Sequence, residues 1–131
     1  MVATTIELLM ASIQPGMKTR ELDAIASREI KRLGALPAFK GYRGFPATIC
    51  VSLNQEIVHG IPGDLVIRDG DVVSMDVGAI VDGYFSDSAV TVGVGNVTPE
   101  AEQLIEATRL SLEKGIEQAT VGKRVGDIGA A

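Results

Sequence analysis

Asp76 and Asp87 lie eleven positions apart in the most strand-like part of the chain. Between them, Asp82-Gly83 favours a two-residue hairpin turn, which places Asp87 opposite Gly78. Gly78 is two residues from Asp76, so the two side chains share one face of the strand. The two aspartates then become diagonal neighbours, with Cα atoms about 7 to 8 Å apart. This spacing predicts two carboxylates that converge on one face of a hairpin.

Two converging carboxylates repel each other unless a proton or a cation lies between them. Hard divalent ions such as magnesium, manganese and iron prefer oxygen ligands, and two metals about 3.5 to 4 Å apart recur in hydrolytic enzymes. The alternative is that both acids face solvent on a half-exposed antiparallel sheet. The aspartates alone leave a metal site and a solvated surface both open.

Other side chains could also do chemistry. His59, the only histidine, lies among apolar neighbours in residues 56–62, which favours a half-buried strand end where it could bind a metal or substrate. The alternative is an imidazole whose hydrogen bonds are made by the backbone. Cys50 is expected to be a small buried residue without a neighbouring base, so no cysteine nucleophile is predicted. Tyr42 and Phe45 either pack or form the wall of an apolar pocket.

Helices are predicted on both sides of this hairpin. An apolar segment over about residues 5–13 is followed by a helix with Thr19 as its N-cap and Gly34 at its C′ position. A long helix opens at Thr98 and runs to about Ala119. The apolar stripe expected to mark its buried side is Leu104, Thr108, Leu112 and Ile116.

Strand signals separate these helices. Alternating and β-branched residues predict strands over residues 48–53, 72–80 and 84–92. The face of the hairpin opposite the aspartates is apolar and is predicted to belong to the core. Its residues are Val73, Met75, Val77, Val90 and Val92.

The end of the sequence echoes its beginning at a constant offset of 106 residues. Gly122 repeats Gly16 and Arg124 repeats Lys18; Asp127 and Ile128 likewise match Glu21 and Leu22. This pattern predicts one complete unit over residues 1–120 and the truncated start of a second repeat over residues 121–131. The alternative is coincidence, because short matches around a glycine turn are common.

Composition narrows the class of protein. The 131 residues suit one domain with a core of its own. A net charge of −5 without a basic cluster argues against nucleic-acid and anionic-membrane partners. One unpaired cysteine and no recognisable signal peptide predict a cytoplasmic protein. No apolar run reaches the roughly 20 residues that a membrane span needs.

Four motifs occur in order along the chain: GYRGFP at 41–46, VHGIP at 58–62, DGDVVSMDVG at 69–78 and DGYFSD at 82–87. In their order and spacing they closely resemble type I methionine aminopeptidases, over essentially the whole chain. The resemblance implies the pita-bread fold, in which two related halves enclose a dinuclear metal centre. This chain would be the N-terminal half, an α+β unit whose antiparallel sheet has a central β-hairpin covered by helices.

The resemblance also implies roles for single residues. Asp76 would chelate one metal, Asp87 would bridge both, and His59 would contact the scissile amide or the tetrahedral intermediate. The residues implied to line the pocket for the methionine side chain are Phe39, Tyr42, Phe45 and Cys50. Phe39 replaces a smaller residue such as cysteine and could narrow this pocket. Gly78 replaces threonine and removes a possible hydroxyl near the metal ligands.

By the same resemblance the cofactor is a divalent metal (Mn, Fe, Co or Zn), two per complete site, and the substrate is a peptide with N-terminal methionine. The family takes a histidine and two glutamates, one of them the base, from its C-terminal half, and this chain has none of those segments. One hypothesis is therefore a methionine aminopeptidase fragment with weak or absent activity. The other is a non-catalytic half-domain, natural or engineered, that folds, dimerises and binds a metal. Self-association or a complementary C-terminal half would cover its exposed apolar surface.

Overall fold

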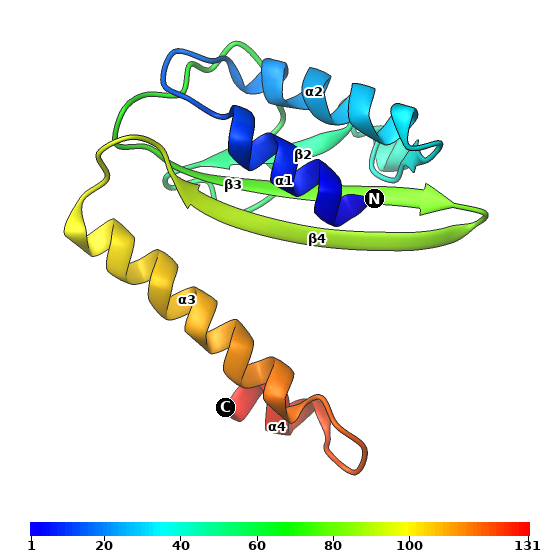
Figure 1. Ribbon diagram of the computed structural model, residues 1–131, viewed down its shortest axis with the longest axis vertical. Coiled ribbons are helices and arrows are strands. Elements are labelled where there is room, and N and C mark those ends of the chain that lie inside the picture. Colours follow the sequence, from blue (N-terminus) through cyan, green and yellow to red (C-terminus); the bar gives the residue numbers. More distant parts are fainter. The chain divides into compact units, whose positions relative to one another are not determined.

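The protein is described by a computed structural model that covers residues 1–131. Its contacts divide it into two compact units, Met1–Val97 and Thr98–Ala131. The elements, shown in Figure 1, are α1 (Val2–Ser12), α2 (Thr19–Arg32), β1 (Leu36–Pro37), the 3₁₀ turn η1 (Tyr42–Gly44), β2 (Ile49–Leu53), β3 (Val72–Val81), β4 (Tyr84–Gly93), α3 (Pro99–Gln118) and α4 (Val125–Ala130). None of the helices is long and apolar enough to span a bilayer.

The first unit is built on an antiparallel sheet with β3 at its centre. β4 pairs with β3 over its whole length, while β2 and then β1 pair with successive parts of the other edge. The turn between β3 and β4 is Asp82-Gly83, with φ of 50° and 83°, the left-handed backbone that a two-residue hairpin needs. The predicted hairpin is confirmed, with both strands extending one residue further, to Val81 and Gly93.

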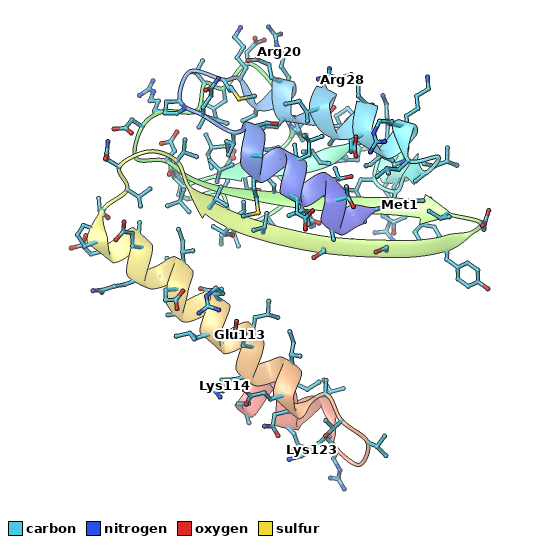
Figure 2. All side chains as sticks on the ribbon, viewed as in Figure 1. Met1, Arg20, Arg28, Glu113, Lys114 and Lys123 are labelled. Carbon is cyan, nitrogen blue, oxygen red and sulfur yellow. The ribbon has the colours of Figure 1, made fainter.

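Alternation along the strands separates a core face from an open face. Helices α1 and α2 lie across one face of the sheet, as Figure 1 shows, and α2 turns Arg20 and Arg28 away from it (Figure 2). On the covered face Val73, Met75 and Val77 are fully buried. Val90 and Val92 pack partly buried against the same core, as predicted. The other face carries the alternate residues of β2, β3 and β4, among them both aspartates.

Local contacts set the two ends of helix α2. Gly34 has φ of 76° directly after α2, as its predicted C′ role requires. The predicted N-cap Thr19 is wrong: it is the first helical residue, and Lys18 is the cap. The reason is that the Thr19 hydroxyl is used elsewhere, accepting the N–H of Gly63 at 2.8 Å. Glu21 instead accepts the Lys18 N–H at 2.7 Å.

The second unit contains α3 and α4. Thr98 caps α3 as predicted, accepting the Ala101 N–H at 3.2 Å. The predicted buried stripe of α3 is wrong for this chain, because Gly115 is the only buried residue of the helix. The unit has no sheet to cover that stripe, so Leu112 and Ile116 are each 62% exposed.

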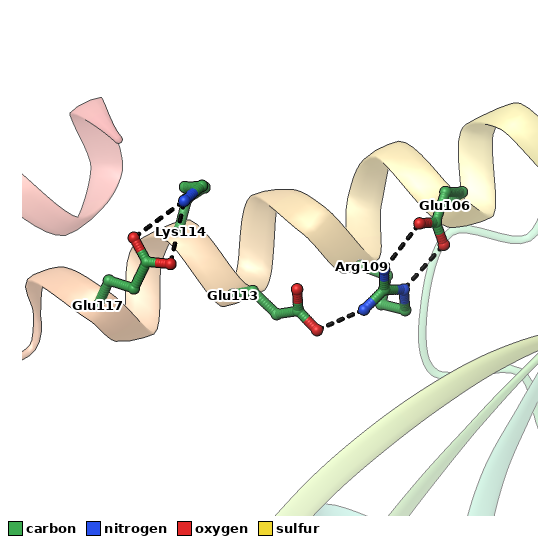
Figure 3. A network of polar contacts seen from close by, with 5 residues as sticks. All are labelled: Glu106, Arg109, Glu113, Lys114 and Glu117. Carbon is green, nitrogen blue, oxygen red and sulfur yellow. Dashed lines mark hydrogen bonds and ion pairs between the residues drawn. The ribbon is translucent and has the colours of Figure 1, made fainter.

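An exposed network of ion pairs runs along α3 (Figure 3). Arg109 binds Glu106 at 2.7 Å and also contacts Glu113, and Lys114 binds Glu117 at 3.0 Å. Such exposed pairs on a helix contribute little to stability, because water and salt screen the charges. They support the helix weakly and do not replace a buried face.

The echo at an offset of 106 residues extends to local geometry. Gly16 and Gly122 have φ of 93° and 92°. In each copy the N-cap donates its N–H to a carboxylate three residues on, Lys18 to Glu21 and Arg124 to Asp127, both at 2.7 Å. These matched turns are consistent with a repeated helix-turn-helix, while the boundary at residue 121 stays a prediction.

Candidate metal centre

The hairpin register brings the two aspartates together as diagonal neighbours. Gly78 pairs with Asp87, and Asp76 pairs with Ala89 on β4. On the other side of β3, Asp76 pairs with Cys50 of β2. Asp76, Asp87 and Cys50 therefore lie on the open face of the sheet, opposite the packed core.

Asp76 is in an electrostatically unfavourable position. Its Oδ1 is buried and has no hydrogen-bond partner. Burial raises the pKa of Asp76, the negative charge of Asp87 raises it further, and the charge of His59 opposes both effects. A buried acceptor without a donor costs free energy, and a neighbouring like charge adds to that cost. A cation between the two carboxylates would relieve both.

The donor set fits part of a metal site. Two carboxylates, one with an unpaired buried oxygen, suit a hard divalent ion. No group of three or more histidine, cysteine, aspartate or glutamate side chains in this chain is placed to hold a metal. Asp76 and Asp87 therefore supply part of a coordination sphere, and further ligands must come from elsewhere.

His59 lies in an exposed loop after β2, and the expected half-buried strand end is wrong. The strand stops at Leu53 because the chain turns there, and the next residue, Asn54, has φ of 51°. The loop returns to β2 at Gly60, whose carbonyl accepts the Val51 N–H at 2.9 Å. His59 itself has φ of 61°. Ser52, on the same face of the sheet as Asp76, accepts the N–H of Gly60 at 3.0 Å, so the loop contacts the aspartate side of the sheet.

The residues implied to line the methionine pocket occupy different environments. Phe39 lies against the sheet, since a Cβ added at Gly78 would fall 2.5 Å from its ring. Cys50 is buried, and burial followed by the charges of Asp76 and Asp87 raises the pKa of its thiol to about 11. A thiol with this pKa is protonated near neutral pH.

The two aromatic residues of the glycine loop are less enclosed. Phe45 is half-buried, whereas Tyr42 is 64% exposed, with the guanidinium of Arg43 5.4 Å from its ring centre. A shallow cavity of about 250 Å³ lies beyond the end of β2 and includes none of the predicted site residues; it is lined by Leu53, Asn54, Gln55, Glu56, Leu65, Val66, Arg68 and Asp71.

Two contacts near the site were not predicted from the sequence. Ser52 accepts a hydrogen bond from Gly60, and the ring of Phe39 fills the space above Gly78. Ser52 could have been found, because it lies two residues after Cys50 on the same face of one strand. The contact between Phe39 and Gly78 leaves no local pattern in the sequence.

An antiparallel sheet covered by helices on one face, with paired carboxylates on the other, suits metal-assisted hydrolysis. The whole chain, residues 1–131, matches the profile of metallopeptidase family M24, and the chain belongs to this family. Within the family it is a homologue of the N-terminal region of methionine aminopeptidases, and its fold is half of the α+β pita-bread fold.

Several relatives support this assignment. The chain is 52% identical over 130 residues to methionine aminopeptidase 1 of Bacillus subtilis, covering 99% of this chain and 52% of that protein. The crystal structure of methionine aminopeptidase from Rickettsia prowazekii matches with a TM-score of 0.95 at 36% identity, over 98% of this chain and 52% of that one. The Thermotoga maritima enzyme matches with a TM-score of 0.94 at 39% identity, over 97% and 51%. The chain thus spans about half the length of the relatives it matches.

Proposed function

We propose that this chain supplies the N-terminal part of a methionine aminopeptidase site, which removes the initial methionine from peptides. The observation that carries the proposal is the buried, unpaired Oδ1 of Asp76 beside Asp87, in a chain of family M24. An enzyme that uses this face needs a cation there, and the unfavourable carboxylate pair is built to receive one.

The proposed roles follow from this placement. Asp76 and Asp87 hold a divalent metal (Mn, Fe, Co or Zn), and His59 donates a hydrogen bond to the substrate from the loop beside them. A bound metal of this kind polarises a carbonyl and lowers the pKa of water. Phe39 and Cys50, on the same face, form the inner wall of the methionine pocket. Tyr42 and Phe45 form its outer wall.

The proposal includes a second component. Two carboxylates do not complete a coordination sphere, and β4 exposes large apolar side chains, with Tyr84 at 82% and Phe85 at 73%. A complementary C-terminal half, or a second copy of this chain, would supply ligands and cover such surface. Residues 121–131 are then the start of the second repeat. A cytoplasmic location fits the single unpaired Cys50.

A second candidate function is a non-catalytic half-domain that folds, self-associates and binds a metal. The observation favouring it is that no three potential ligands converge in this chain. Both candidates require the aspartate pair. They differ in whether methionine is released.

Manganese binding, measured by titration calorimetry, tests the aspartate pair directly. The parent chain should bind weakly, and Asp76→Asn and Asp87→Asn should each abolish the heat of binding. Asp82→Asn is the matched control, because Asp82 lies in the exposed turn of the same hairpin and asparagine tolerates its φ of 50°. Equal binding by all four proteins would exclude the proposed site.

Metal-dependent release of methionine from a short Met-Ala peptide separates the two functions. Release that requires Asp76, either by the chain alone or after addition of a C-terminal half, supports the aminopeptidase. If neither the chain alone nor the chain with an added C-terminal half releases methionine, and manganese still binds, the result supports the non-catalytic half-domain.

A further inference from the structure

Ser52 is a buried polar residue that the proposed chemistry does not use. It is 3% exposed and lies on β2, on the same face as Cys50. Its Oγ accepts the backbone N–H of Gly60 at 3.0 Å. The hydroxyl therefore joins the site face of the sheet to the residue that follows His59.

Both backbone polar groups of Gly60 are hydrogen-bonded to β2. Its carbonyl accepts the Val51 N–H at 2.9 Å, while its own N–H binds Ser52. A Cβ at Gly60 would overlap the carbonyl oxygen of Val51 and lie 2.9 Å from the Cα of Ser52. Only glycine permits so close an approach of two backbones.

His59 adopts a backbone conformation that needs support. Its φ of 61° is in the left-handed region, which is unfavourable for residues other than glycine. Such conformations persist where the surroundings hold them, and they cluster at functional sites. His59 is exposed, so the restraint comes from its anchored neighbour Gly60 rather than from packing of its own side chain.

We propose that Ser52 is a positioning residue for His59. The Ser52 hydroxyl fixes Gly60 and thereby keeps His59 in the left-handed conformation on the aspartate side of the sheet. The catalytic consequence rests on the proposed function; the conformational part does not. Ser52 lies on the same face as Cys50, which pairs with Asp76, so a shift of the loop at Gly60 would change the face of the sheet that carries the proposed metal ligands.

The conformational part is tested by NMR on the parent chain, Ser52→Ala and Ser52→Thr. His59 is the only histidine, so its imidazole signals are unambiguous. Loss of one hydrogen bond should make exchange of the Gly60 amide proton about fivefold faster. It should also lower the heteronuclear NOE of His59 and shift its imidazole signals. Ser52→Thr keeps the hydroxyl and should restore all three measurements.

Ser74→Ala is the matched control. Ser74 pairs with Ser52 on the neighbouring strand β3. Its hydroxyl is hydrogen-bonded to Thr91 at 2.8 Å and not to the His59 loop. It should leave His59 and Gly60 as in the parent. If Ser52→Ala does not fold, Ser52→Cys, which keeps a weak acceptor of similar size, should show a smaller change of the same sign. Unchanged signals in Ser52→Ala, or equal changes in Ser74→Ala, overturn the proposal.

The activity arm separates this inference from the proposed function. In an assembly that releases methionine, Ser52→Ala should lower kcat about fivefold with little change in KM. If His59→Ala leaves methionine release unchanged while Ser52→Ala shows the expected NMR changes, the proposed catalytic role of His59 is excluded and its positioning by Ser52 is supported. If His59→Ala abolishes release and Ser52→Ala alters no signal, the positioning fails alone.

Discussion

A carboxylate oxygen of Asp76 is buried without a donor, and a second carboxylate lies diagonal to it. Without a bound metal, burial of the Asp76 charge beside Asp87 lowers the stability of the fold. Sites arranged for function commonly reduce stability in this way. The cost should therefore be measurable as a gain when the charge is removed.

Asp76→Asn should raise the free energy of unfolding without metal by about 1 kcal/mol, because a neutral amide is less costly to bury beside Asp87. Urea denaturation measures this. Manganese should stabilise the parent and not the variant. Asp82→Asn, in the exposed turn, should change neither quantity. A variant less stable than the parent would mean that Asp76 has favourable partners.

The ring of Phe39 lies directly above Gly78, on the face of the sheet that carries the two aspartates. A Cβ at residue 78 would lie 2.5 Å and 2.8 Å from two atoms of the Phe39 ring. Gly78→Ala should therefore destabilise the chain by about 1 to 3 kcal/mol through overpacking. In a Phe39→Ala background the same change should cost less, because only the Cβ of Ala38, 3.0 Å from the added atom, remains close. Thermal or urea unfolding of the four proteins gives the coupling, and simple additivity would contradict the contact.

At the scale of elements, aspartates in the loop before β3 join strand ends that are distant in sequence. Asp69 accepts the backbone N–H of Asn96, after β4, at 2.9 Å. Asp71 accepts the side-chain amide of Asn54, after β2, at 3.0 Å. These bonds hold the ends of three strands together and so help to keep the sheet in register.

Asp69 gives a test by pH. The backbone N–H of Asn96 and then its side chain lower the pKa of the Asp69 carboxyl. Its folded pKa is thus below the unfolded value, so its stabilisation is present above about pH 4 and is lost as pH falls through the folded pKa. Asp69→Asn should lower stability near neutral pH and reduce the loss of stability on acidification. Urea unfolding across this range measures both, with Asp82→Asn as the control. Parallel pH profiles for parent and Asp69→Asn would exclude the effect.

At the scale of the whole molecule, the two units differ in how much they bury. β2 and the centre of β3 lie in a core, whereas α3 buries only Gly115. Amide protons of α3 should exchange at least about a hundredfold more slowly when a complementary C-terminal half is bound than in this chain alone. The reason is that an uncovered helix is only marginally stable. Within this chain they should exchange faster than those of β3. Equal protection of α3 and β3 by hydrogen exchange would show that its apolar side is covered.

The mass in solution tests how the site is completed. We expect a dimer whose fraction rises with manganese, because each copy offers two carboxylates and exposed apolar side chains on β4. Light scattering with and without manganese measures this. The double variant Asp76→Asn/Asp87→Asn should not respond to the metal. A monomer indifferent to manganese would exclude metal-driven self-association and favour a separate C-terminal half.

The sequence by itself determined the features that depend on near neighbours. The hairpin register follows from Asp82-Gly83 and an alternation of period two, and both aspartates were placed correctly from it. The cap at Thr98 and the C′ glycine at residue 34 are also local, and both were predicted.

Only the tertiary structure decided the features that depend on residues far apart in the chain. Thr19 lost its cap role to a hydrogen bond with Gly63, and His59 is exposed in a left-handed conformation held by β2. The burial of the Asp76 oxygen and the ring above Gly78 likewise arise where separate segments meet. An apolar stripe predicts that a helix has a side to bury, as α3 does. Whether that side is buried depends on the partner that the fold places against it.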